Sequence, residues 1–288
     1  MIMNPKIART ERALRQRVSA WRMAGETVAL VPTMGALHGG HLTLVEQVTK
    51  KADRTIVSVF VNPSQFAAHE DLDTYPRDEA ADLRELAKLG VDLVFVPSVE
   101  LMYPENYATA VSVEGPATAG LEDKSRPHFF GGVATVVAKL LLLCQPHMAI
   151  FGEKDFQQLL VIRQMTQDLN IPVKILAGTT IREADGLALS SRNAYLTPGQ
   201  RSIAPMLHAV LKDAASKIGR GGKVSRILGT AKTRLGRAGF RLDYLEARDT
   251  VTLAPLEKDA TGPARLLVAA HLGTTRLIDN ISLKISDG

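Results

Sequence analysis

Residues 31–41 read Val31-Pro-Thr-Met-Gly-Ala-Leu-His38-Gly39-Gly40-His41 and join a predicted strand to a predicted helix. The apolar run over residues 27–31 stops at Pro32, which is typical of a buried strand. From His41 to residue 52, apolar side chains recur at positions 42, 45 and 48, a spacing that predicts a helix. This strand–loop–helix unit indicates a parallel sheet wrapped by helices.

The same alternation continues to about residue 180 and then changes. Further strands are predicted at 55–61, 91–96, 148–151 and 173–177, and further helices at 78–89, 133–143 and 155–169. Later in the chain, helices are predicted at 201–219 and 224–238 and strands at 243–247 and 265–270. We therefore expect an α/β domain over residues 1–181 and a smaller C-terminal α+β domain over 182–288.

Composition restricts the class of protein. The chain has 288 residues, of which 45% are hydrophobic and 23% charged, enough to bury a core without disulfides. Its one cysteine, Cys144, ends an apolar run, so we expect a buried thiol in a reducing compartment. The N-terminus lacks the apolar stretch of a signal peptide, and the most apolar window, 133–150, is too short and polar to span a bilayer. We expect a cytoplasmic protein.

The net charge of +5 raises the possibility of a nucleic-acid partner. The basic residues gather between 201 and 241, where ten Lys or Arg accompany one acid, Asp213. Only Phe240 could stack on a base in this stretch, so solvated helix faces explain the charge better than a nucleic-acid site. A nucleic-acid-binding protein remains an alternative, which predicts steeply salt-dependent binding to oligonucleotides.

The glycine-rich loop has the chemistry of a phosphate site. Gly35, Gly39 and Gly40 allow close backbone approach, and free N–H groups at a helix start favour an anion. His38 and His41 can donate hydrogen bonds to one phosphate chain during displacement at phosphorus. A zinc site and a turn with incidental histidines are the alternatives, although no nearby cysteine completes a zinc site.

Polar residues also follow two other predicted strands. Asn62 and Gln65 come after one strand, and residues 152–155 after another. Open parallel sheets bind ligands at the edge where their strands end. We expect these side chains to serve one ligand-binding edge.

The His-X-Gly-His pattern resembles the nucleotidyltransferase superfamily, and five segments together resemble its pantoate–β-alanine ligase family over nearly the whole chain. These segments are Val31-Pro-Thr-Met-Gly35, Phe60-Val-Asn-Pro-Ser-Gln-Phe66, Phe151-Gly-Glu-Lys-Asp-Phe-Gln-Gln158, Asp185-Gly-Leu-Ala-Leu-Ser-Ser-Arg-Asn193 and Thr274-Thr-Arg-Leu-Ile-Asp-Asn280. The resemblance implies a Rossmann-like sheet and a C-terminal lid domain. It also implies that pantoate and ATP form pantoyl adenylate, which β-alanine converts to pantothenate with release of AMP.

The resemblance also implies residue roles. His41 matches the family's proton donor, and His38 and Lys154 match phosphate contacts. The implied ATP contacts are Met34, Gly35, Ala36, Leu37, His38, Gly39, Gly40, His41, Gly152, Glu153, Lys154, Asp155, Ile181, Leu189, Ser190, Ser191 and Arg192. Within this set, Asp155 matches a contact to the ribose. Ile181 and residues 189–192 match a stretch that closes over the phosphates as a flexible lid.

Substrate and metal roles follow from the same resemblance. Gln65 and Gln158 match contacts to pantoate, and Gln65 also one to β-alanine, while Asn62 and Arg126 match further pocket positions. Mg²⁺ is expected with ATP, and Asp82 matches a proposed ligand, although an exposed helical carboxylate is the alternative. The family also implies a homodimer.

One loop departs from the family pattern Arg-Pro-Gly-His-Phe-Arg-Gly-Val. Here it reads Arg126-Pro-His-Phe-Phe-Gly-Gly-Val133, so that Phe129 replaces the family's His in an ungapped alignment. A compensating gap would instead match His128-Phe129 to the family's His-Phe and displace the residues around them. We assign His128 no role and expect activity to survive, because both ATP segments and both glutamines are intact. The remaining histidines, His69, His147, His208 and His271, are interpreted as ordinary surface or core residues.

A second enzyme class remains open. A nucleotidyltransferase that makes a nucleotide-activated small molecule would share His38 and His41. It gives no reason for the pair Gln65 and Gln158.

Overall fold

The computed structural model describes residues 4–67, 72–256 and 260–285, and the chain forms two compact units. The first unit comprises Met1–Ala117, Arg126–Glu153 and Gln158–Thr179. The second comprises Thr118–Ser125, Lys154–Gln157 and Thr180–Gly288. Two short segments that precede residue 181 thus belong with the C-terminal residues. The predicted division between residues 181 and 182 assigns both segments to the first domain.

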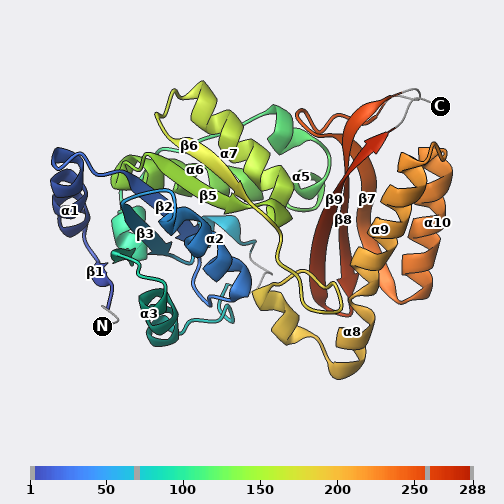
Figure 1. The fold of residues 1–288 in the computed structure, drawn as a ribbon, viewed down its shortest axis with the longest axis horizontal. Helices are drawn as coiled ribbons and strands as arrows, with labels where there is room; N and C mark the ends of the chain where they lie inside the picture. The colour runs from blue at the N-terminus through green and yellow to red at the C-terminus, as the bar shows by residue number, and fades with distance from the viewer. Residues whose placement is uncertain (1–3, 68–71, 257–259, 286–288) are drawn as a thin grey trace. The chain divides into compact units, whose positions relative to one another are not determined.

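The first unit contains a six-stranded sheet, of which β1, β2, β3, β5 and β6 are labelled in Figure 1. The strand order is β1-β4-β3-β2-β5-β6, and every neighbouring pair is parallel. This confirms the predicted parallel sheet. Its strands are β1 (Lys6–Ala8), β2 (Val28–Thr33), β3 (Arg54–Val59), β4 (Leu93–Phe95), β5 (Met148–Gly152) and β6 (Lys174–Gly178).

The strand order changes direction at β2. The chain places β3 on one side of β2 and, later, β5 on the other. In open parallel sheets, ligands bind at the carboxyl ends of the strands beside such a switch point. The loop after β2 therefore lies at the expected ligand edge of this sheet.

Helices cover this sheet as their apolar spacing requires. Leu44, Val45 and Val48 of α2 pack with Leu86 of α3 and the buried side chains of β2 to β5. Helix α6 is apolar on nearly all sides and is accordingly buried. The long helices that begin in this part of the chain are α1 (Glu11–Met23), α2 (Gly39–Thr49), α3 (Glu79–Lys88), α6 (Phe129–Cys144) and α7 (Phe156–Asp168).

The second unit packs helices on an antiparallel sheet. Strands β7 (Phe240–Asp249), β8 (Gly262–Leu272) and β9 (Thr275–Ile285) form the sheet in that order. Its apolar face packs against α9 (Met206–Gly219) and α10 (Val224–Arg237), which confirms the smaller α+β part. The single helix predicted over 201–219 is wrong, because α8 (Pro198–Ile203) ends just before Pro205, which cannot continue a helix.

Shorter elements connect these parts. They are η1 (Pro63–Gln65), α4 (Val99–Met102), η2 (Gly115–Thr118), α5 (Glu122–Ser125), η3 (Glu153–Asp155) and η4 (Ser191–Tyr195). No helix in the described part of the chain is long and apolar enough to cross a membrane. Cys144 is fully buried at the end of α6, and burial raises its pKa to about 12, so the expected structural thiol is confirmed.

Candidate active site

The loop after β2 ends in two stacked imidazoles. His38 is the N-cap of α2, and its Nδ1 accepts a hydrogen bond from the Gly40 amide at 3.1 Å. The rings of His38 and His41 lie 4.1 Å apart between centroids and are inclined by 28°. Because Nδ1 of His38 is an acceptor, the neutral ring carries its proton on Nε2. The His38 ring can therefore donate from Nε2 to an anion at the start of α2.

The backbone before these histidines is held by a carboxylate. Asp82 on α3 accepts the amide of Ala36 at 3.0 Å through Oδ2 and that of Leu37 at 2.8 Å through Oδ1. Only 4% of Asp82 is exposed, so the exposed carboxylate that we considered as an alternative is excluded. Burial raises the pKa of Asp82, whereas the two amide hydrogen bonds lower it, and the net shift is upward.

A second group of predicted site residues meets beyond β3. Asn62 is 1% exposed, and its amide donates to Gln65 Oε1 at 2.9 Å and to the Gly132 carbonyl at 3.2 Å. Its Oδ1 accepts from the Tyr103 hydroxyl at 2.8 Å. Gly132 has no side chain to obstruct this contact, since a Cβ there would lie 2.2 Å from the Ser64 carbonyl oxygen. Asn62 therefore fixes Gln65 in place.

The altered loop contributes to the same group. The Arg126 guanidinium donates to the Gln65 carbonyl at 3.0 Å and lies 3.9 Å above the ring of Phe129. An arginine in this position gains a cation–π contact from the aromatic face. Phe129 thus supports Arg126, whereas His128 is exposed.

The segment after β5 is divided between the units. Gly152 ends β5, and Glu153 belongs with it to the first unit, whereas Lys154 and Asp155 belong to the second. Gln158 lies in the first turn of α7 and returns to the first unit. The neighbouring Gln157 points into the second unit, where its side chain accepts from the Glu122 amide at 3.0 Å and donates to Asp123 at 2.9 Å.

Strand β9 holds the predicted ATP segments of the second unit. Asp279 receives two hydrogen bonds from Arg182, at 2.7 and 2.8 Å, and Asn280 donates to the Lys154 carbonyl at 2.8 Å. The Leu189 amide donates to the Ile181 carbonyl at 2.9 Å, which places these two predicted residues side by side. In the following turn, the Ser190 hydroxyl accepts from the Arg192 amide at 3.3 Å and starts η4.

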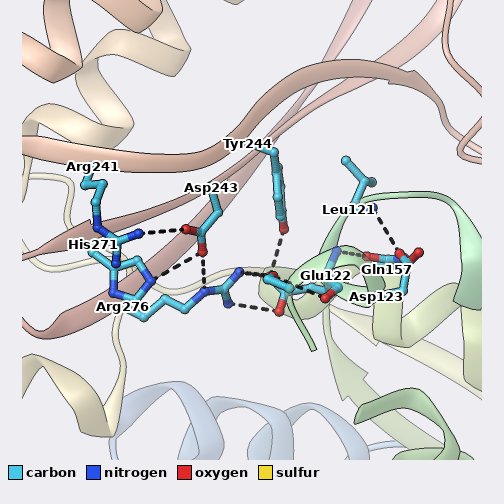
Figure 2. Close-up of polar contacts among 10 residues, drawn as sticks. Leu121, Glu122, Asp123, Gln157, Arg241, Asp243, Tyr244, His271 and Arg276 are labelled. Atoms are coloured by element: carbon cyan, nitrogen blue, oxygen red, sulfur yellow. Dashed lines mark hydrogen bonds and ion pairs between the residues drawn. The ribbon is translucent and has the colours of Figure 1, made fainter. Parts of the chain in front are cut away.

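Sequence reasoning missed a buried polar network in the second unit. Figure 2 shows Glu122 facing Arg276, which donates to both of its carboxylate oxygens at 2.9 and 2.8 Å. Tyr244 donates to Glu122 at 2.9 Å, and Asp243 accepts from Arg276 Nε at 2.8 Å (Figure 2). The network ties residues 118–125 to the C-terminal sheet. Its only signal in the sequence was Arg276, inside the segment 274–280.

The remaining sequence predictions concern residues outside these groups. His147 accepts the Val28 amide at 2.9 Å, and His271 lies 3.4 Å from Asp243, so both are structural, as expected. His208 lies 3.5 Å from Asp279, whereas His69 lies outside the described residues. In the basic stretch, Arg201 is paired with Glu183 and Asp185, each at 2.6 Å.

Comparison with known proteins identifies the family to which this chain is related. The sequence model of the family "Pantoate-beta-alanine ligase" matches residues 6–282. A pantothenate synthetase of Bradyrhizobium sp. is 53% identical over 98% of this chain and 100% of its own length. One of Nitrobacter hamburgensis is 54% identical over 97% of this chain and 99% of its own.

Solved structures agree with the sequence relatives. The pantothenate synthetase of Thermus thermophilus is 48% identical, covers 96% of this chain and 98% of its own, and superposes with a TM-score of 0.90. The pantoate-beta-alanine ligase of Francisella tularensis, solved with "Beta-gamma ATP" and beta-alanine, is 34% identical and has a TM-score of 0.81 over 96% of this chain and 97% of its own. On both kinds of similarity, the chain belongs to the pantoate-beta-alanine ligase family.

Proposed function

We propose that this chain condenses pantoate with β-alanine at the expense of ATP, through a pantoyl-adenylate intermediate. The observation that carries the proposal is the stacked pair His38 and His41 at the start of α2. This helix follows β2, the strand at which the sheet order changes direction. This pair occurs in a chain that belongs to the ligase family over residues 6–282. The relative from Francisella tularensis was solved with an ATP compound and β-alanine, which supports the same substrates here.

The reaction proceeds in two displacements. A carboxylate oxygen of pantoate bonds to the α-phosphorus of ATP, the bond from that phosphorus to the bridging oxygen breaks, and pyrophosphate leaves. The β-alanine nitrogen then bonds to the acyl carbon, a proton leaves the amine, and AMP departs with the former carboxylate oxygen. Both steps depend on positioning and charge stabilisation rather than on a covalent nucleophile of the protein.

The two histidines are proposed to stabilise charge on the phosphates. In the neutral His38 ring, Nε2 carries the proton and is the donor atom, because Nδ1 accepts the Gly40 amide. His41, stacked beside it, is proposed as the proton donor to the oxygen that leaves phosphorus. The backbone of residues 34–41 would face the same phosphates.

The remaining ATP contacts are proposed residue by residue. Lys154 would contact phosphate and Asp155 the ribose, next to Gly152 and Glu153 at the end of β5. Ile181 and the residues from Leu189 to Arg192 would complete the nucleotide contacts. The hydrogen bonds from β9 support both sets, since they fix the Lys154 backbone and the Arg182 side chain.

The acid and the amine are assigned to the group around Asn62. Gln65 would bind pantoate and β-alanine, and Gln158 would bind pantoate. Arg126 and Asn62 would orient Gln65, since Arg126 holds its backbone carbonyl and Asn62 its side chain. The cation–π contact to Phe129 keeps Arg126 in place and supports activity despite the altered loop.

Several accompanying properties are also proposals. Mg²⁺ would arrive with ATP, bound by its phosphates. The family suggests a homodimer in the cytoplasm, without nucleic-acid or membrane partners. It also suggests that residues 1–181 form the domain that binds ATP and pantoate, and that residues 182–288 form a lid domain.

The test is a pyrophosphate-release assay with ATP and Mg²⁺, to which acids and amines are added in turn. We expect pyrophosphate only when pantoate is present, and AMP only after β-alanine is added. A nucleotidyltransferase that lacks acyl transfer would need no amine and would release no AMP. The proposal would be refuted if the folded protein formed pantothenate no faster than a reaction mixture without protein.

A further inference from the structure

Two consecutive residues of the loop after β2 have left-handed backbone conformations. Gly35 has a φ of +78° and Ala36 a φ of +50°. Glycine adopts such a conformation readily, whereas alanine does so only when the surroundings hold it there. Something outside the loop must therefore stabilise Ala36.

The Asp82 carboxylate meets that requirement. The amides of Ala36 and Leu37 both point at it and bond to different oxygens, at 3.0 and 2.8 Å. Hydrogen bonds from backbone amides to an ionised acceptor are stronger than neutral ones. The carboxylate is attached to the first turn of α3, so it ties the loop to a rigid element.

The contact with Gly35 makes the fit tight. A Cβ built on Gly35 would lie 3.0 Å from Asp82 Oδ2 and 3.0 Å from Val59 Cγ1. A side chain at position 35 would thus displace either the carboxylate or the β3 residue behind it. We call the packed pair of Gly35 and Asp82 the loop clamp.

The same contacts do not fit a metal ligand. Both oxygens of Asp82 already accept amides, and the residue is 4% exposed. Among residues 4–67, 72–256 and 260–285, no three His, Cys, Asp or Glu side chains lie close enough together to hold a metal ion. Mg²⁺ needs several oxygen ligands in near-octahedral geometry, which a buried and occupied carboxylate supplies poorly.

We infer that Asp82 is a positioning residue. It fixes the backbone of residues 34–38 so that His38 and the start of α2 face the phosphates of ATP. It acts through the loop and not through Mg²⁺. The inference rests on the proposed function for its ligand, ATP, but the clamp itself is a property of the free protein.

The first experiment is amide hydrogen exchange on the free protein and on Asp82→Asn. The asparagine has nearly the same shape, but its NH₂ group would face an amide that now has no acceptor. We expect exchange at Ala36 and Leu37 to rise at least about tenfold, while β2 and α2 keep their protection. Asp78→Asn is the matched control, because Asp78 caps the same helix and asparagine caps equally well. Unchanged exchange at Ala36 and Leu37 in Asp82→Asn would overturn the inference.

The second experiment separates the clamp from a metal site. ATP binding is measured by calorimetry with Mg²⁺ and, separately, with EDTA. The clamp predicts that Asp82→Asn weakens binding by the same factor in both conditions and leaves the Mg²⁺ concentration for half-maximal activity unchanged. Weaker binding in Mg²⁺ alone, or a raised Mg²⁺ requirement, would assign Asp82 to the metal and overturn the inference.

Gly35→Ala tests the clamp from the loop side. It leaves the carboxylate chemically intact, yet the added methyl group would lie only 3.0 Å from Asp82 Oδ2, and position 35 has a positive φ. We expect the same rise in exchange at Ala36 and Leu37, and this variant decides the matter if Asp82→Asn does not fold. Failure of the proposed function would appear separately, as an unmodified protein that releases no pyrophosphate with pantoate.

Discussion

The side-chain amide of Asn280 on β9 donates a hydrogen bond of 2.8 Å to the backbone carbonyl of Lys154. Asn280 is 6% exposed, and its neighbour Asp279 holds Arg182. Two adjacent residues of one strand thus fix two segments that are far apart in the sequence. These contacts give a structural role to the segment 274–280, which is one of the segments that resemble the family.

Removing the Asn280 contact should impair ATP use. A net hydrogen bond contributes about 1 kcal/mol, so Asn280→Ala should lower kcat/KM for ATP about fivefold, with a smaller effect on pantoate. Lys284→Ala, an exposed change on the same strand, is the control. A kcat/KM for ATP within about 1.5-fold of the unmodified protein would contradict a role for this contact.

The imidazoles and Lys154 should matter far more. If they stabilise charge that develops on phosphate, replacing His38, His41 or Lys154 by Ala should cost at least about 10²-fold in rate. His128→Ala, at an exposed position without an assigned role, serves as the control and should be neutral. An effect below about threefold for any of the three would remove that residue from the proposed machinery.

Phe129 should affect the acid rather than the nucleotide. Phe129→Leu keeps most of the apolar volume but removes the aromatic face under Arg126, 3.9 Å away. A cation–π contact of about 0.5–1 kcal/mol predicts a rise of about two- to fivefold in KM for pantoate. Steady-state kinetics with pantoate and with ATP as the varied substrate would check this. An equal change in both KM values would instead indicate a general loss of structure.

His271 should make the second unit sensitive to acid. Burial lowers the pKa of His271 below 6.5, and Arg241 and Arg276 also lower it, whereas Asp243 raises it. The unfolded chain therefore binds a proton more readily than the folded one, and stability falls as the pH drops below about 6.5. When the pH is lowered from about 7.5 to about 5.5, the Tm of His271→Gln should fall by less than the Tm of the unmodified protein. His128→Gln, which removes an exposed histidine, should show the full loss; equal losses in both variants would contradict the assignment.

The sequence predicted elements whose signal is local. The alternation of apolar runs and helical spacing located strands β2 to β6 of the parallel sheet to within a few residues. It located helices α2, α3, α6, α7 and α10 equally well. The pattern did not reveal β1, which has only three residues, or α1, although Thr10 caps it and Leu14 and Val18 are buried along it. It also missed β9, where charged and polar residues interrupt the apolar alternation.

Site residues could be predicted where they follow a strand end or belong to a family motif. Contacts between residues far apart in the sequence could not be predicted in this way. The helix start at His38 and the group of Asn62, Gln65 and Arg126 follow from strand ends and family motifs. The clamp by Asp82 could not be inferred, because it joins residues 46 positions apart through backbone amides that every sequence contains. The pairing of Glu122 with Arg276 could not be predicted either, because the two residues lie 154 positions apart and the sequence around Glu122 does not indicate its partner.

The most direct test of the account follows an oxygen atom. Pantoate labelled with ¹⁸O in its carboxylate is incubated with the protein, ATP, Mg²⁺ and β-alanine, and the AMP is examined by mass spectrometry. Attack of the carboxylate on the α-phosphorus predicts one ¹⁸O in each AMP formed and the other in pantothenate. AMP without the label, in a reaction that still forms pantothenate, would contradict the acyl-adenylate route.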